Sequence, residues 1–133
     1  MADTARSLLT ELRHILLVHH KTLLDSERAR YDHDVERIKS SGQLLNLVLH
    51  DPFFAWLHEL SELIVMIDET LDADQPPSDA DAARLLGQAR ALLAPAESGN
   101  GFRGQYFEAL QRDPDVVIAH GAAMQGLGSL ANG

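Results

Sequence analysis

The sequence predicts an all-α protein, an up-down four-helix bundle with a long first helix and a central apolar second helix. Apolar residues recur at helical spacing in four regions, and short segments containing Pro, Gly or Ser separate these regions. No segment alternates apolar and polar residues for long enough to predict a strand. The 133 residues fit one domain, residues 1–133, which is long enough to bury a core.

The central helix is expected over residues 51–72. Asp51 is a suitable N-cap, and Pro52 suits the first helical position, where a backbone N–H is not needed. The main apolar stripe of this helix consists of Phe53, Trp56, Leu57, Leu60, Leu63, Ile64, Ile67 and Leu71. Phe54 and Val65 fall well outside the stripe, which indicates either a central position in the domain or a second apolar face against another chain.

The first helix is expected to begin near Thr4 and to run to about Lys39, because neither Gly nor Pro interrupts it. Its first half carries a clean apolar stripe: Ala5, Leu9, Leu12, Leu16, His20 and Leu23. After Leu24 the stripe changes phase, so the second half is expected to pack on a different partner, to project from the body or to pair with another subunit. Gly42 is expected to lie just past the helix end.

The remaining elements follow from local signals. Residues 43–50 predict a short helix that stops before the Asp-Pro pair, because a residue that precedes proline disfavours helix. Residues 78–94 predict a third helix with an N-cap serine and two acidic residues in its first turn. Residues 95–101 are expected to be flexible. A fourth helical region begins at residue 102, breaks at a second Asp-Pro pair, and leads into a flexible tail from about residue 126.

Composition excludes several classes of function. The net charge of −9 argues against binding to nucleic-acid phosphates or to an anionic membrane. The absence of cysteine excludes disulfides, thiolate metal sites and a cysteine nucleophile. The N-terminal residues lack an apolar signal core, and no apolar run is long enough to span a bilayer. We therefore expect a soluble cytoplasmic protein.

Seven histidines are the main oddity of the composition, and in a helical bundle they suggest a metal site. Part of the hemerythrin-like pattern is present, namely His20 on the first helix and His58-x-x-x-Glu62 on the second. The third helix has no histidine, and Gln125 stands where the pattern has an aspartate five residues after His120. In addition, His58 and Glu62 project about 160° from the apolar stripe of their helix, which is typical of a surface pair.

His19 and His20 flank the apolar stripe of the first helix and are therefore expected to point inward. With His120 they form a candidate metal, haem or small-ligand site; the alternative is that they are hydrogen-bonded core histidines. The ferritin-like alternative is weaker, because its single Glu11-x-x-His14 motif faces away from the stripe. No nucleophile elbow, phosphate loop or dinucleotide fingerprint is present, so we expect a non-enzymatic protein without a cofactor.

Surplus apolar residues predict self-association, most simply as a homodimer, or contact with another protein. The candidate interface combines the rephased seam of the first helix with the two off-stripe residues of the second. Its members are Leu24, Tyr31, Val35, Ile38, Phe54 and Val65.

Residues 51–69 and the segment Asp-Pro-Asp-Val-Val-Ile-Ala-His at 113–120 resemble segments of small bacterial all-helical proteins of uncharacterised function. The resemblance covers about a third of the chain. It implies a helical fold and a bacterial source, and it implies no activity.

Overall fold

The computed structural model describes residues 2–94 and 101–132, and these residues contain helices and no strand. The all-helical class is therefore confirmed. The elements, in chain order, are α1 (Ala2–Asp34), α2 (Ser41–His50), the 3₁₀ helix η1 (Pro52–Leu57), α3 (His58–Asp72), α4 (Asp79–Leu92), α5 (Phe102–Arg112) and α6 (Pro114–Asn132).

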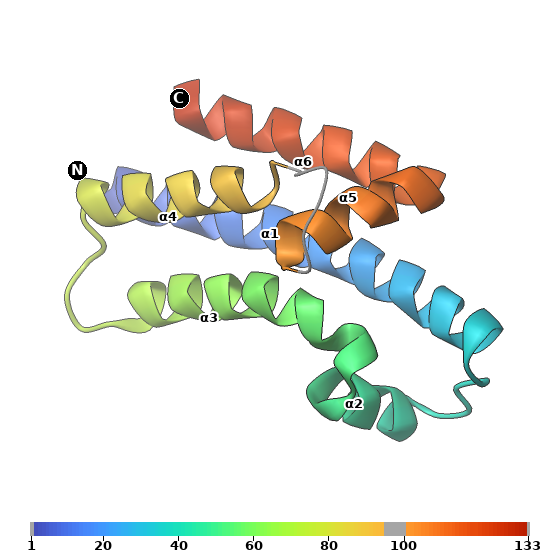
Figure 1. The fold of residues 1–133 in the computed structure, drawn as a ribbon. Coiled ribbons are helices and arrows are strands. Elements are labelled where there is room, and N and C mark those ends of the chain that lie inside the picture. The colour runs from blue at the N-terminus through green and yellow to red at the C-terminus, as the bar shows by residue number, and fades with distance from the viewer. Residues whose placement is uncertain (1, 95–100, 133) are drawn as a thin grey trace.

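Helix α1 is the central element, because α3, α4 and α6 all pack against it. Figure 1 shows these four longer helices lying side by side, with each running opposite to the one before it. Helix α5 is a shorter piece that packs on α6 and η1. Helix α2 lies apart from the other helices, below the C-terminal end of α1, and its main contact is with η1.

The core is built from the predicted apolar stripes. In α1 the stripe is fully buried except at its polar member, and in α3 and α4 the central apolar positions are buried as well. The core residues of these three helices include Leu9, Leu12, Leu16, Leu23, Leu60, Ile67, Leu85 and Ala89. Between α1 and α3 the ion pair of Arg13 with Asp68 closes the edge of this packing.

Helix α1 ends at Asp34, so the prediction that it continues to Lys39 is wrong. At its end the backbone N–H groups of Val35 and Glu36 both donate to the carbonyl of Tyr31, at 2.9 and 3.2 Å. The chain then reverses: the Asp32 carboxylate accepts from the N–H of Ile38 at 2.7 Å, and the Ile38 side chain is buried. The gain from burying this side chain outweighs the continuation of an exposed helix.

The prediction that Gly42 follows the end of the first helix is also wrong. Ser40 instead caps α2, since its hydroxyl accepts from the N–H of Gln43 at 3.1 Å, and Gly42 lies inside the first turn of α2. Ser40 is a signal for a helix start and Gly42 is a signal for a helix end. The two signals lie two residues apart, and the structure follows the N-cap.

The expected central helix is two elements. Asp51 is the N-cap as predicted, because its carboxylate accepts from the N–H of Phe53 at 2.8 Å. The next residues form a 3₁₀ helix, whose tighter turn changes the direction in which each side chain points relative to α3. Phe54, which lies outside the predicted stripe, is consequently buried with 0% exposure. Val65, in the regular part, stays 51% exposed as predicted.

The second Asp-Pro pair separates α5 from α6 as predicted, and the Asp113 carboxylate accepts from the N–H of Asp115 at 2.9 Å. The tail from residue 126, which is expected to be flexible, is helical, and α6 continues through Asn132. Gly126 lies where α6 packs closely on α1, and a Cβ at this position would stand 2.9 Å from Cδ1 of Ile15.

The predicted N-cap of the third helix is confirmed as a capping box between Ser78 and Asp81. The segment expected to be flexible, residues 95–101, lies outside the described residues except for its last member.

Candidate functional site

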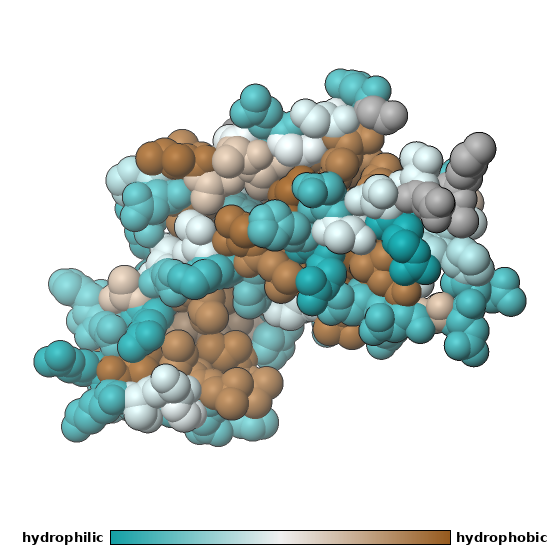
Figure 2. Space-filling model, turned by 180° about the vertical axis from the view of Figure 1, so that it is seen from behind, coloured by the Kyte–Doolittle hydropathy of each residue, from teal (hydrophilic) through white to brown (hydrophobic). Residues whose placement is uncertain are grey.

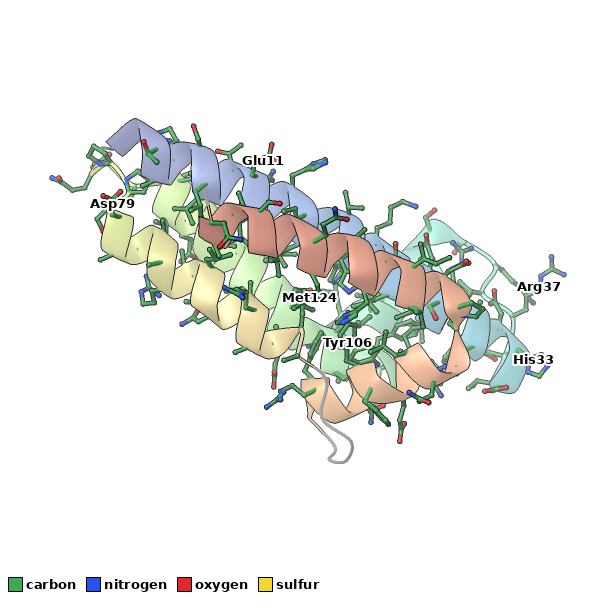
Figure 3. The ribbon with its side chains drawn as sticks, turned by 90° about the horizontal axis from the view of Figure 1, so that it is seen from above. Glu11, His33, Arg37, Asp79, Tyr106 and Met124 are labelled. Carbon is green, nitrogen blue, oxygen red and sulfur yellow. The ribbon has the colours of Figure 1, made fainter. Side chains whose placement is uncertain are left out.

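A buried histidine, a buried tyrosine and a half-buried histidine from three helices form a hydrogen-bonded chain. Nε2 of His19 in α1 lies 2.6 Å from the Tyr106 hydroxyl of α5, and that hydroxyl lies 2.6 Å from Nδ1 of His120 in α6. Tyr106 is fully buried and His19 is 2% exposed, whereas His120 is half-buried. In Figure 3 the labelled Tyr106 lies among the helices beneath α6. The chain thus runs from the core towards the surface.

The single proton of the Tyr106 hydroxyl allows this chain two arrangements, because the hydroxyl donates to one imidazole and accepts from the other. If Nε2 of His19 donates, then Nδ1 of His19 is a bare acceptor; if Nε2 accepts, then Nδ1 carries the proton. In both cases Nδ1 of His19 is buried and has no hydrogen-bond partner among the described residues. An unpaired buried polar atom costs about 1–3 kcal/mol.

The surroundings of these groups favour their neutral forms. Burial, together with smaller contributions from the nearby His120 and His20, lowers the pKa of His19 to about 4. Burial also lowers the pKa of His120, and burial together with His58 lowers that of His20. Burial raises the pKa of Tyr106. The hydrogen-bonded side chains of His19, Tyr106 and His120 are therefore all uncharged near pH 7.

The three candidate metal ligands lie near one another, but they form hydrogen bonds to different partners. His19 and His120 share the Tyr106 hydroxyl, while His20 binds the Ser61 hydroxyl of α3 at 2.9 Å. Across residues 2–94 and 101–132, no group of three or more His, Cys, Asp or Glu side chains is placed to hold a metal ion. A metal at the three histidines stays a hypothesis, and it requires the Tyr106 hydroxyl to move from between two of them.

The hemerythrin-like pair on the second predicted helix has separate surroundings. His58 is half-buried, and its Nε2 donates to the backbone carbonyl of Val48 at 2.8 Å. Glu62 is exposed. His58, which is expected to project towards solvent or a partner, instead contacts α2 of the same chain, because α2 folds back over the start of α3 and offers it an unpaired carbonyl from its last turn.

A buried carboxylate that sequence reasoning missed connects α1, η1 and α5. Glu27 is 0% exposed and accepts hydrogen bonds from Arg30 at 2.8 Å, from Arg112 at 2.5 Å and from Nε1 of Trp56 at 3.3 Å. The Arg30 guanidinium also stacks over the ring of Phe53 at 3.9 Å. The signal for burial was present, because Glu27 occupies the phase of the apolar stripe in the first helix.

The predicted interface does not form one exposed surface. Tyr31, Ile38 and Phe54 are buried within the chain, and the Tyr31 ring packs on Phe54 with 5.6 Å between centroids. Leu24 is half-buried. Val35 and Val65 are exposed, at 58% and 51%. Tyr31, Ile38 and Phe54 therefore pack within the fold, because the chain reversal after α1 turns Ile38 inward and the 3₁₀ helix turns Phe54 inward.

The exposed apolar surface lies mainly elsewhere, and α2 is its clearest part. None of the ten residues of α2 is buried, although five of them are Leu or Val. Leu45 and Leu49, one helical turn apart, are 59% and 54% exposed. Figure 2 shows the resulting apolar surface at its lower left, in the part of the molecule that contains α2.

Comparison of the chain with protein-family models, with curated proteins and with solved structures finds no match. Within the part of the chain that the structure describes, no helix combines the length and the apolar character needed to cross a membrane.

Proposed function

We propose that this chain is a four-helix up-down bundle, extended by α2 and α5, that works through protein–protein contact and self-associates as a homodimer. In this proposal the contact is the α2 surface, which consists of Leu45 and Leu49 with the half-buried Leu44 and Val48 at its edge. The proposed role is non-enzymatic.

The observation that carries this proposal is a short apolar helix that buries none of its residues. A ten-residue helix has little stability of its own and normally depends on the burial of one face. Here the fold covers that face only partly, and neighbouring exposed apolar side chains are typical of a contact surface.

A second copy is the favoured occupant because the α2 surface lacks the negative charge that the rest of the protein carries. The chain carries a net charge of −9, so two copies repel each other over most of their surfaces. Helix α2 contains no Asp, Glu, Lys or Arg. In an antiparallel pair, Leu45 of one copy lies against Leu49 of the partner subunit and the reverse, which gives a self-complementary contact without like-charge repulsion.

Sedimentation velocity and light scattering across micromolar concentrations test this contact. The wild-type chain is expected to shift from monomer to dimer as concentration rises, and the Leu45→Asp/Leu49→Asp variant is expected to stay monomeric. Val65→Asp is the matched control, since this exposed valine lies on α3 and outside the α2 surface. Far-UV circular dichroism verifies that both variants are folded. A wild type that stays monomeric, or a double variant that still dimerises, would refute the proposal.

A second candidate function is the binding of a small ligand or transition metal at His19, His20 and His120. The unpartnered Nδ1 of His19 favours it, because buried polar atoms normally have a partner. Elemental analysis of untagged protein, purified without chelator, is the test. Near-stoichiometric metal that is lost in His19→Leu supports this candidate, and metal-free folded protein removes its metal form.

A further inference from the structure

A groove on the described surface lies between α1 and α6. Two cavities of about 190 and 480 Å³ lie along it, and they adjoin each other, because Ala119 and Ala122 line both. Figures 1 and 3 show the two helices side by side along most of their length. Along α1 the lining runs from residue 14 to residue 29, which at 1.5 Å per residue is about 22 Å.

Two large apolar side chains that line this groove are accessible to a partner. Val18 of α1 is 55% exposed and Ile118 of α6 is 72% exposed, and both side chains line it. The buried His19, with its unpartnered Nδ1, forms part of the lining as well. Two large apolar side chains that border one hollow offer contact area to a complementary partner.

One end of the groove is acidic. Its lining there includes Asp25, Asp113 and Asp115, and neither cavity is lined by Lys or Arg. Lys21 pairs with Asp25 at 3.1 Å but lies outside the lining, so this end keeps an excess of negative charge. The groove therefore combines a length of about four helical turns, an apolar middle and one anionic end.

We propose that the α1/α6 groove binds an amphipathic helix of a partner protein, with an apolar stripe against Val18 and Ile118 and Lys or Arg residues over the acidic end. Helix-in-groove recognition uses anchors at spacings of three, four and seven residues, which suits a groove of this length. The lining of the same groove on a second copy contains no Lys or Arg that could face the three carboxylates. The charge of the lining therefore favours a basic partner.

The test uses a labelled synthetic helix of about four turns, with Leu and Ala on one face and a lysine-rich last turn. Binding is measured by fluorescence anisotropy, first to the full wild-type chain and then to Leu45→Asp/Leu49→Asp. Equal affinity is expected for both proteins, because the groove and the α2 surface share no residue. A failure of self-association therefore leaves this test intact. Control peptides carry glutamates in place of the lysines, or the same residues with the stripe scrambled.

Ile118→Asp is expected to weaken binding by about tenfold or more, the scale for loss of a central apolar anchor. Val117→Asp is the matched control, since Val117 is 49% exposed on the same helix but does not line the groove. Asp25→Asn/Asp115→Asn is expected to weaken binding mainly at low salt and to flatten its salt dependence.

Three results would overturn the proposal. In the first, the glutamate peptide binds as tightly as the lysine peptide. In the second, Val117→Asp and Ile118→Asp weaken binding equally, or neither affects it. In the third, Leu45→Asp/Leu49→Asp still dimerises and Ile118→Asp dissociates that dimer, which would assign the groove to a second copy.

Discussion

At the scale of single residues, the chain buries ionisable groups in two different ways. His19 is buried in its neutral form within an uncharged hydrogen-bonded chain. Glu27 is buried beside two guanidinium groups that face its carboxylate oxygens. A neutral buried group resists protonation, whereas a charged buried group depends on its partners.

The histidine predicts a pH-dependent stability. The pKa of His19 falls from 6.5 in the unfolded chain to about 4 in the folded one, so between these values the unfolded state binds more protons. The contribution of neutral His19 to the free energy of unfolding is fully present above pH 6.5. It is lost as the pH falls towards 4, and the total loss is about 3 kcal/mol. Urea unfolding across this range measures it. His19→Gln, which cannot titrate, is expected to flatten the profile, and an unchanged profile would contradict the assignment.

The glutamate predicts a large effect from a small change. Glu27→Gln leaves Arg30 and Arg112 without their shared carboxylate, and its expected cost is about 3 kcal/mol, since the arginines are partly exposed. The exposed pair of Lys21 with Asp25 is the comparison, because Asp25→Asn is expected to change stability by only about 0.5 kcal/mol. Denaturant midpoints measure both. Equal effects of the two substitutions would mean that burial does not decide the energetics.

At the scale of helices, caps decide where elements begin and packing decides where they end. Asp51, Ser78 and Asp113 act as their local sequence predicts. The ends of α1 and α6 depend instead on contacts far along the chain. Ile38 folds back into the core beyond the end of α1, and the packing of Gly126 against Ile15 accompanies the continuation of α6.

The extent of α6 is testable through its glycines. Gly128→Ala is expected to stabilise the protein by about 0.5–1 kcal/mol, because nothing lies within 4 Å of the added Cβ and alanine favours helix. Gly126→Ala is expected to gain less, because its Cβ requires Ile15 to shift. Thermal unfolding of both variants is the measurement. If neither substitution changes stability, the segment after residue 126 is not helical in solution.

At the scale of the whole molecule, two surfaces are available for contact. The α2 surface is free of charged side chains and suits a second copy of an acidic protein. The α1/α6 groove carries an acidic end and suits a basic helix. Half of the residues in the predicted interface stabilise the fold instead, since Tyr31, Ile38 and Phe54 belong to the buried core. The two binding experiments separate these surfaces.

The sequence by itself determined the all-helical class, the buried stripes and the N-caps. Those features depend on residues within one or two turns of each other, so periodicity and cap chemistry are enough to predict them. The inward direction of His19 was predictable in the same way. Its partner was not, because Tyr106 lies 87 residues away along the chain.

Only the tertiary structure decided which residues beyond the stripes are buried. Phe54 turns inward through a 3₁₀ helix and Ile38 through a chain reversal, while Glu27, which shares the phase of the apolar stripe, gains its partner Arg112 from α5. Each of these outcomes depends on which helix faces meet, and local propensity does not contain that information. For the same reason only Val35 and Val65 of the six predicted interface residues are exposed, and the α2 surface with Leu45 and Leu49 was not predicted, because burial is a property of the assembled faces.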